Sequence, residues 1–286
     1  MTIQLKKHSF ITKIEDFVRS KGGRCALPVY ILLFIGFVAP LFMVLGFSFA
    51  EPRSFHAFTS FTLENFIHIF DGSSSVWRSF AWSIGLAAFV TAVLAVVCYP
   101  VAVGMVRVFG KGMSTFISIL FVFPLFVSEN VRLYGWILFF GKNGVLDGIC
   151  KMVGLSGPDI LFTPGMTAMG LAYSFLPYML FPVIMGVALV PKDLITWWQI
   201  ELPLSMPGVL IGMLLTFVLA TGSMSESKIL GGQSIIVITN DIDVSFTFSQ
   251  NWPQGAALAV VLTLIIGALT LYAFKKIDLD KLMGRA

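Results

Sequence analysis

The sequence predicts an all-α integral membrane protein with about six transmembrane helices and both termini in the cytoplasm. Of its 286 residues, 57% are hydrophobic and only 12% are charged, whereas soluble domains usually carry about 25% charged residues. The mean hydropathy of +0.90 agrees with this bias. A soluble core could not hide so much apolar surface, so the bilayer must be the solvent for most of the chain.

Six apolar stretches are long enough to cross a bilayer, which takes about 20 helical residues. They run approximately over residues 26–49, 79–106, 113–140, 166–190, 204–222 and 255–274. The third stretch is interrupted by Glu129 and Arg132. The chain is therefore expected to divide into a cytoplasmic tail at 1–25, a six-span membrane domain at 26–274 and a cytoplasmic tail at 275–286. A cytoplasmic connector at 191–203 links the fourth and fifth spans.

The distribution of Lys and Arg predicts the orientation, because cytoplasmic loops are enriched in these residues. With both tails inside, thirteen of the 19 basic residues fall on the cytoplasmic side. The first 25 residues are basic and lack the short apolar region and cleavage site of a secretory leader, so they are interpreted as a tail before an uncleaved span. The even number of spans agrees with this charge bias.

Smaller features predict local structure. Residues 61–66 (FTLENF) favour a short amphipathic helix with Thr62 as its N-cap. Residues 141–144 (GKNG) and 231–232 (GG) are typical of turns. Gly208 and Gly212 form a GxxxG pattern, which permits close approach of another helix.

No motif for catalysis, phosphate binding or metal binding is found. Cys25, Cys98 and Cys150 show no CxxC spacing and fall in different predicted compartments, so neither a disulfide nor a metal site is expected. The basic residues gather in the tails and form no stripe that would bind nucleic acid. We therefore expect no enzyme activity, no cofactor, no metal and no nucleic-acid partner.

Charged residues in or near the spans are the candidate functional residues, because a charge at mid-bilayer costs several kcal/mol. Glu129 and Arg132 are three residues apart and would share a helix face. Two readings stay open for them, an ion pair near the outer boundary or a place along a substrate path. Glu201, just before the fifth span, is expected to be solvated or to face a partner. The acidic residues of the last outer loop are expected to be solvated; these are Glu226, Asp241 and Asp243.

Five short motifs occur in the order of a known family. They are residues 61–66, residues 131–136 (VRLYGW) with the following GKNG turn, residues 202–208 (LPLSMPG), the GG pair, and residues 251–257 (NWPQGAA). With them the chain resembles the inner-membrane permease subunits of bacterial ABC importers, in the spermidine/putrescine-type branch. The resemblance covers most of the chain.

The resemblance implies a multi-pass protein of the bacterial inner membrane that forms the translocation pathway for a small solute of the polyamine class. It implies four kinds of partner: cytoplasmic ABC ATPase subunits, a second permease subunit, a periplasmic solute-binding protein and the lipid bilayer. The ATPase-coupling region would lie in the cytoplasmic connector. Its residues are Lys192, Asp193, Leu194, Ile195, Thr196, Trp197, Trp198, Gln199, Ile200 and Glu201.

This connector departs from the family pattern, which places a Glu-Ala-Ala helix ahead of the Leu-Pro pair. The twelve residues from Pro191 to Leu202 hold about two or three helical turns at 1.5 Å per residue. Two alternatives therefore stay open. One is a transport-defective paralogue with a shortened coupling loop; the other is an ATP-independent carrier or channel, which the absence of a visible internal repeat disfavours.

Overall fold

The computed structural model describes residues 21–58, 60–71, 75–191, 201–232 and 234–276, except for the side chains of 21–25 and 274–276. The secondary structure of these residues is helical, with no strand among them. Five of their helices are long and apolar enough to cross a membrane, and a sixth crossing is formed if one sharply bent pair counts as a single span. The predicted all-α membrane fold with about six spans is confirmed. The cytoplasmic location of both termini stays a prediction.

The five continuous spans lie close to their predicted positions. The first, Ala26–Ser48, comprises most of α2 (Lys21–Leu33), the π-helical segment η1 (Phe34–Val38) and α3 (Ala39–Ser48). The second comprises α5 (Val76–Val103) and a π-helical end, η2 (Gly104–Val108). The others are α9 (Pro164–Ala188), α10 (Leu202–Gly222) and α13 (Trp252–Lys276).

The third predicted span is broken. It corresponds to α6 (Lys111–Val122), the 3-10 turn η3 (Phe123–Phe126) and α7 (Glu129–Phe140), and α8 (Val145–Met152) follows beyond its predicted end. The two halves meet at an angle of 104°. The chain is extended at Val127 and Ser128, so the helix cannot continue through the junction. The expected interruption is confirmed, and it falls immediately before Glu129.

Three short helices occupy the connections between spans: α4 (Glu64–Phe70), α11 (Ser225–Ile229) and α12 (Ile238–Thr247). The expected helix at 61–66 starts later than predicted, and its N-cap is Leu63 and not Thr62. The Thr62 hydroxyl still accepts the Glu64 N–H, at 3.1 Å. Both predicted turns are present, with left-handed backbone at Asn143 (φ 62°) and Gly232 (φ 53°).

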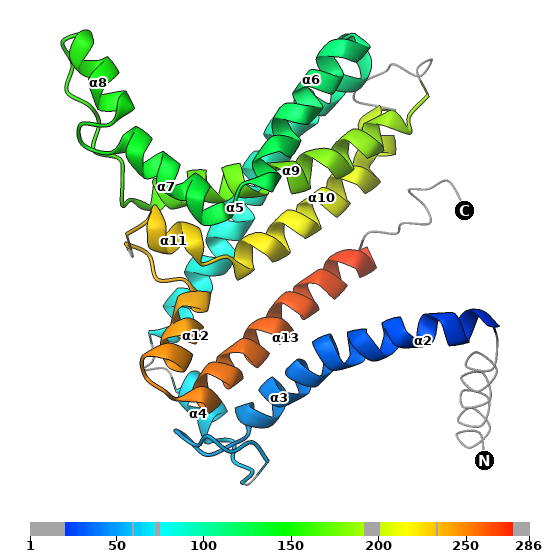
Figure 1. Cartoon of the computed structure of the whole chain (residues 1–286), viewed down its shortest axis with the longest axis vertical. Coiled ribbons are helices and arrows are strands. Elements are labelled where there is room, and N and C mark those ends of the chain that lie inside the picture. Colours follow the sequence, from blue (N-terminus) through cyan, green and yellow to red (C-terminus); the bar gives the residue numbers. More distant parts are fainter. Residues whose placement is uncertain (1–20, 59, 72–74, 192–200, 233, 277–286) are drawn as a thin grey trace.

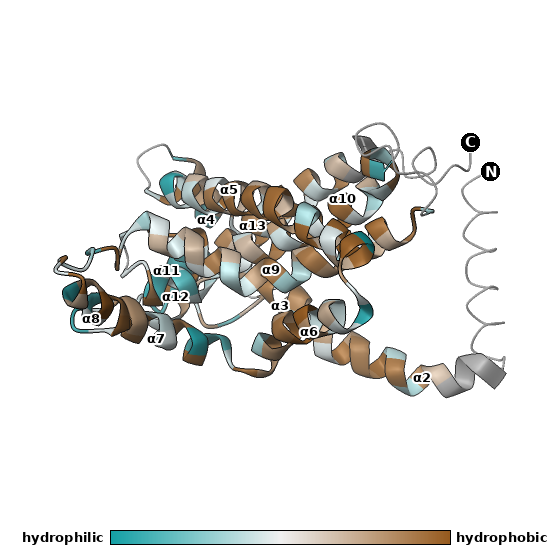
Figure 2. Cartoon of the chain, turned by 90° about the horizontal axis from the view of Figure 1, so that it is seen from above, coloured by the Kyte–Doolittle hydropathy of each residue, from teal (hydrophilic) through white to brown (hydrophobic). Residues whose placement is uncertain are grey.

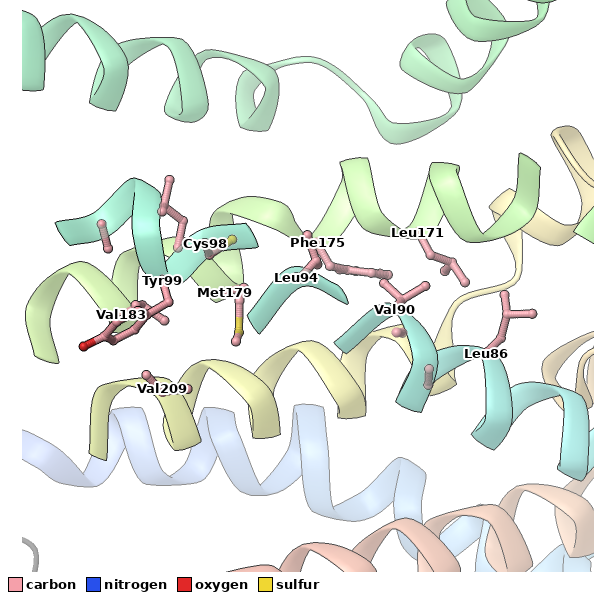
Figure 3. Packing of buried hydrophobic residues seen from close by; sticks show 14 of the residues in the cluster. Leu86, Val90, Leu94, Cys98, Tyr99, Leu171, Phe175, Met179, Val183 and Val209 are labelled. Carbon is pink, nitrogen blue, oxygen red and sulfur yellow. The ribbon is translucent and has the colours of Figure 1, made fainter. Parts of the chain in front are cut away.

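The main core lies between α5, α9 and α10. Figure 3 shows Leu86, Val90 and Leu94 of α5 facing Leu171, Phe175 and Met179 of α9. A second cluster packs α13 against α12, α4 and the start of α5. In Figure 2 the long helices are largely hydrophobic, and hydrophilic residues gather at α8 and the neighbouring short helices. The long helices thus present apolar surface outward, as lipid-facing helices must.

Two glycines allow α9 and α10 to touch backbone to backbone. A Cβ built on Gly208 would lie 2.4 Å from the Pro182 carbonyl oxygen and 2.7 Å from the Gly186 Cα. At Gly212 the nearest atom would be the Met179 carbonyl oxygen, at 2.9 Å. The close approach predicted from the GxxxG pattern is confirmed.

The described ends of α2 and α13 lie at the same end of the helix bundle as the junction of α9 with α10 (Figure 1). The short helices α4, α11 and α12 lie at the opposite end. These two ends are called below the connector end and the α11 end.

Candidate functional site

At the connector end, α9 stops at Ala188 and α10 begins at Leu202. Residues 192–200 of the predicted coupling region lie outside the described residues, and Glu201 is the one member that is described. The expectation that Glu201 is solvated or faces a partner is wrong, because this residue is only 2% exposed. Its carboxylate is turned into the protein and pairs with Arg107 of η2.

Arg107 binds both edges of the connector. Its Nε donates to Glu201 Oε1 at 3.0 Å, and its Nη2 donates to the Val190 and Val187 carbonyl oxygens at 2.8 and 3.3 Å. The Arg107 side chain is 14% exposed and the Glu201 side chain 3%. Carbonyls in the last turn of a helix lack intrahelical partners, and a cation there also complements the helix dipole. The Val187 carbonyl also accepts the Val190 N–H, at 3.3 Å. One guanidinium therefore binds the chain at the end of α9 and the carboxylate that precedes α10.

The backbone conformation at the end of α5 places Arg107 beside the connector. Residues Gly104–Val108 form a π-helical turn, which closes with a hydrogen bond from the Phe109 N–H to the Gly104 carbonyl. Single π turns inside helices are frequent at functional sites. About two turns earlier on α5, the Tyr99 hydroxyl lies 3.2 Å from the Ser205 hydroxyl of α10. Polar contacts thus join α5 to α10 at two successive levels.

At the α11 end, the sequence-based expectation for Glu226 is also wrong. The residue is fully buried, with no exposed surface. Helix α11 packs against α7 and α9, and a Cβ built on Gly170 of α9 would meet Leu230 Cδ1 at 2.5 Å and Glu226 Cγ at 3.2 Å. The absent side chain at Gly170 lets α11 lie on α9 and bury its acidic residue.

The Glu226 carboxylate is incompletely satisfied. Its Oε2 accepts a hydrogen bond from the Ser223 hydroxyl, and its Oε1 has no partner among the described residues. Burial raises the pKa of the Glu226 carboxyl, the Ser223 hydroxyl opposes this rise, and Glu129 raises the pKa further. The Ser174 hydroxyl, like Glu226 Oε1, is buried without a hydrogen bond among the described residues. Unmet hydrogen-bonding capacity in a buried acid costs free energy, so this carboxyl is a candidate ligand-binding group.

Glu129 and Arg132 are not paired with each other in the described part of the chain, so the ion-pair reading is not supported. The Arg132 guanidinium lies over the Tyr173 ring, 5.5 Å from its centroid. Its Nε and Nη1 atoms are buried and have no hydrogen-bond partner among the described residues. Both residues lie in the first turn of α7. The charge of Glu129 raises the pKa of Glu226, whereas the Arg132 side chain contacts Tyr173 of α9. Their place along a substrate path stays a prediction.

The remaining acidic residues of this loop, Asp241 and Asp243, lie in α12 and are partly buried, so they are less solvated than expected. Asp243 pairs with Lys228 of α11 at 2.5 Å, and both side chains are about one-third exposed. Burial raises the pKa of the Asp241 carboxyl, against a lowering by the Ser79 hydroxyl. Among the described residues, no group of three His, Cys, Asp or Glu side chains is arranged to hold a metal ion.

Sequence reasoning missed Arg107 because its three partners lie 80 to 94 positions further along the chain. A charged residue at the end of an apolar helix is usually explained as an interfacial anchor. The available signal was the second charge, Glu201, at the start of another span. Two opposite charges at the same predicted depth are candidates for a pair.

Comparisons with known proteins agree with this architecture. No family model matches the chain. It is 30% identical over 264 residues to the spermidine/putrescine transport system permease protein PotB of Haemophilus influenzae, covering 86% of this chain and 89% of that protein. The chain belongs to the permease family of ABC importers.

Other relatives support this membership. The permease is 28% identical over 274 residues to PotB of Escherichia coli, covering 88% of this chain and 98% of that protein. It is 26% identical over 214 residues to the inner membrane ABC transporter permease protein YdcU of the same organism, covering 64% and 66%. It is accordingly a multi-pass protein of the inner membrane.

Solved structures share the fold. A bacterial ABC transporter involved in the import of alginate superposes with a TM-score of 0.70 at 14% identity, covering 89% of this chain and 95% of that chain. A second structure of an alginate transporter, in complex with a pentasaccharide-bound periplasmic protein, gives a TM-score of 0.64 at 14% identity, covering 87% and 91%.

Proposed function

We propose that this permease forms the translocation pathway for a polyamine, with transport driven by a separate ABC ATPase and with no catalytic activity of its own. The names of its relatives at 26–30% identity support an ABC permease, and those at 28–30% name spermidine and putrescine. The observation that carries the proposal is the buried Glu226 carboxyl, which keeps one oxygen free at the α11 end.

The chemistry of a polyamine fits this carboxyl. Aliphatic amines are protonated at neutral pH, and each ammonium group offers several N–H donors. A carboxylate that accepts from an ammonium forms a charge-assisted hydrogen bond, about twice as strong as a neutral one. Glu129 supplies a second negative charge close to Glu226, and an arriving cation would offset both the burial of Glu226 and its repulsion from Glu129.

Each end of the helix bundle is assigned a proposed partner. ATPase subunits would dock at the connector, a periplasmic solute-binding protein at the α11 end, and a second permease subunit alongside the lipid-facing helices. This arrangement places both termini and the two tails, 1–25 and 275–286, in the cytoplasm. The partner of one alginate-transporter structure, a periplasmic binding protein, supports the arrangement.

The short connector supports two alternative functions. A chain that assembles with an ATPase without coupling to it would be a transport-defective paralogue. A chain that moved solute without ATP would be a carrier or channel. The first alternative is favoured by the short connector, which has only twelve residues from Pro191 to Leu202 inclusive.

The test is uptake of radiolabelled spermidine by proteoliposomes that hold the complete importer, with ATP inside and the binding protein outside. We expect ATP-dependent uptake, and we expect Glu226→Gln to raise the KM for spermidine by about 10- to 100-fold, because one charge-assisted hydrogen bond is worth about 1.5–3 kcal/mol. The control is Glu64→Gln, which changes an exposed acidic residue of α4 and should leave the KM unchanged.

Three results would contradict the proposal. ATP hydrolysis without uptake would establish the transport-defective paralogue. Uptake without ATP would establish the carrier or channel. An unchanged KM in the Glu226 variant would remove that residue from the pathway.

A further inference from the structure

Arg107 is the one point in the described chain where the end of α5 and both edges of the connector are joined by a single side chain. The guanidinium is rigid and planar, so its Nε and Nη2 atoms keep a fixed separation. The Glu201 carboxylate and the Val187 and Val190 carbonyls are therefore held at fixed positions relative to α5. Neither edge of the connector can shift without moving Arg107 or breaking these bonds.

Burial makes this junction strong. Glu201 is 2% exposed, and the Arg107 side chain is 14% exposed. Water does not screen such a pair as it screens a surface ion pair, and removing one partner leaves an uncompensated buried charge. The exposed pair of Lys142 and Asp159, with side chains 85% and 71% exposed, lacks these properties.

The Arg107–Glu201 junction is also connected to the main core through close contacts between α5, α9 and α10. Gly186 and Gly208 hold the backbones of α9 and α10 in contact close to it. Tyr99 and Ser205 bridge α5 and α10 deeper in the bundle. Leu94, Cys98 and Tyr99 then belong to the cluster that packs α5 against α9 (Figure 3).

We propose that Arg107 is a positioning residue that transmits displacement of the connector edges to α5, and so couples ATPase movement to the core of the pathway. This inference rests on the proposed function, in which the connector contacts the ATPase. It also explains how a short connector can couple the ATPase to the transmembrane helices, because both edges of the connector are bound directly to α5. Energy transfer would then depend on Arg107 and Glu201 as well as on the connector itself.

The proposal requires the forked shape of arginine and more than its charge. A lysine ammonium is a point charge on a flexible stem, whereas the guanidinium presents donors in a fixed geometry. Arg107→Lys should therefore fail to bind both edges together. Glu201→Gln keeps an acceptor for the Arg107 Nε, so it should preserve much of the connection, whereas Glu201→Ala should remove it.

The experiment measures spermidine taken up per ATP hydrolysed by the complete importer in proteoliposomes. Allosteric coupling free energies of 1–3 kcal/mol correspond to factors of about 5 to 150, and we expect Arg107→Lys and Glu201→Ala to lower this ratio within that range. Glu201→Gln should lie between these variants and the wild type. Lys111→Gln, at an exposed position at the start of α6, is the control and should match the wild type.

Co-purification of the ATPase with each variant separates assembly from coupling. A complex that assembles with Arg107→Lys or Glu201→Ala and keeps the wild-type ratio would overturn the proposal. So would an equal ratio for Glu201→Gln and Glu201→Ala, because the effect would then not follow the hydrogen bond. A wild-type importer without ATP-driven uptake would contradict the proposed function itself, and that result is distinguishable because it needs no variant.

Discussion

The connector end and the α11 end each hold a buried glutamate and an arginine, yet they satisfy them differently. Glu201 and Arg107 bind each other, and Arg107 also fills two helix-end carbonyls. Glu226 and Arg132 make no such pair, and both keep buried polar atoms without partners among the described residues. The same residue types thus make a closed junction at one end and an open polar cluster at the other.

The difference indicates where the molecule is built to hold its geometry and where it is built to receive another group. A paired buried charge resists any change that separates the pair. An unpaired buried group is costly by itself and gains free energy when a ligand or a second chain supplies the missing partner. Fixed geometry suits the transmission of movement, and unmet polarity suits solute recognition.

The largest expected effect is at the connector end. Arg107→Gln should lower the free energy of unfolding by about 3–5 kcal/mol, because it leaves the Glu201 carboxylate buried and unpaired. Arg132→Gln should cost no more than about 1 kcal/mol, because its guanidinium has only a ring contact to lose. Thermal unfolding of the detergent-solubilised protein measures both, and equal losses would contradict the comparison.

A double replacement tests whether the cost arises from the unpaired charge. Arg107→Leu combined with Glu201→Leu should lose only about 1–2 kcal/mol, since no charge remains and two carbonyls lose a donor. The double variant would then be more stable than Arg107→Gln alone. Additive losses in a cycle with each single Leu variant would show that the two side chains do not interact.

At the α11 end, Tyr173→Leu should cost about 1 kcal/mol. It removes the ring beneath Arg132 and the edge contact of Tyr173 with Trp136. Tyr173→Phe keeps both contacts and serves as the matched control. The same unfolding assay applies, and an equal loss in the Phe variant would assign the effect to the hydroxyl.

The smallest expected effect is a pH dependence at Glu226. Its pKa is raised in the folded protein, so its stabilising contribution is complete below the ordinary value of 4.5 and is lost as pH rises through the folded value. The wild type should therefore lose stability relative to Glu226→Gln above that pH, with Tm shifting by about 2–4 °C per kcal/mol. Asp241 is common to both proteins and cancels in the difference.

A Tm difference that stays constant from pH 4 to pH 8 would contradict a raised pKa at Glu226. A wild type that gains stability relative to Glu226→Gln over this range would show a lowered pKa, as expected for a carboxylate paired with a cation. That outcome would place Arg132 or another basic group against Glu226 and remove the contrast between the two ends.

The sequence by itself determined the membrane fold and the positions of the spans. Apolar runs of about 20 residues have one stable placement in lipid, because their backbone groups must be satisfied within a helix. The break before Glu129 and the contact at Gly208 also followed from local signals, namely charges within an apolar run and small residues at helical spacing. Membership of the ABC permease family rested on short motifs in order along the chain.

Only the tertiary structure decided what the charged residues do. Glu201, Glu226 and Asp243 all lie in polar connections, and their burial depends on which helices pack over them. Arg107 meets partners 80 to 94 residues away, and Arg132 turns to Tyr173 instead of to Glu129. Hydrophobic length specifies that a segment enters the bilayer, whereas the pairing of its charges is set by side chains that only the packed helices bring together.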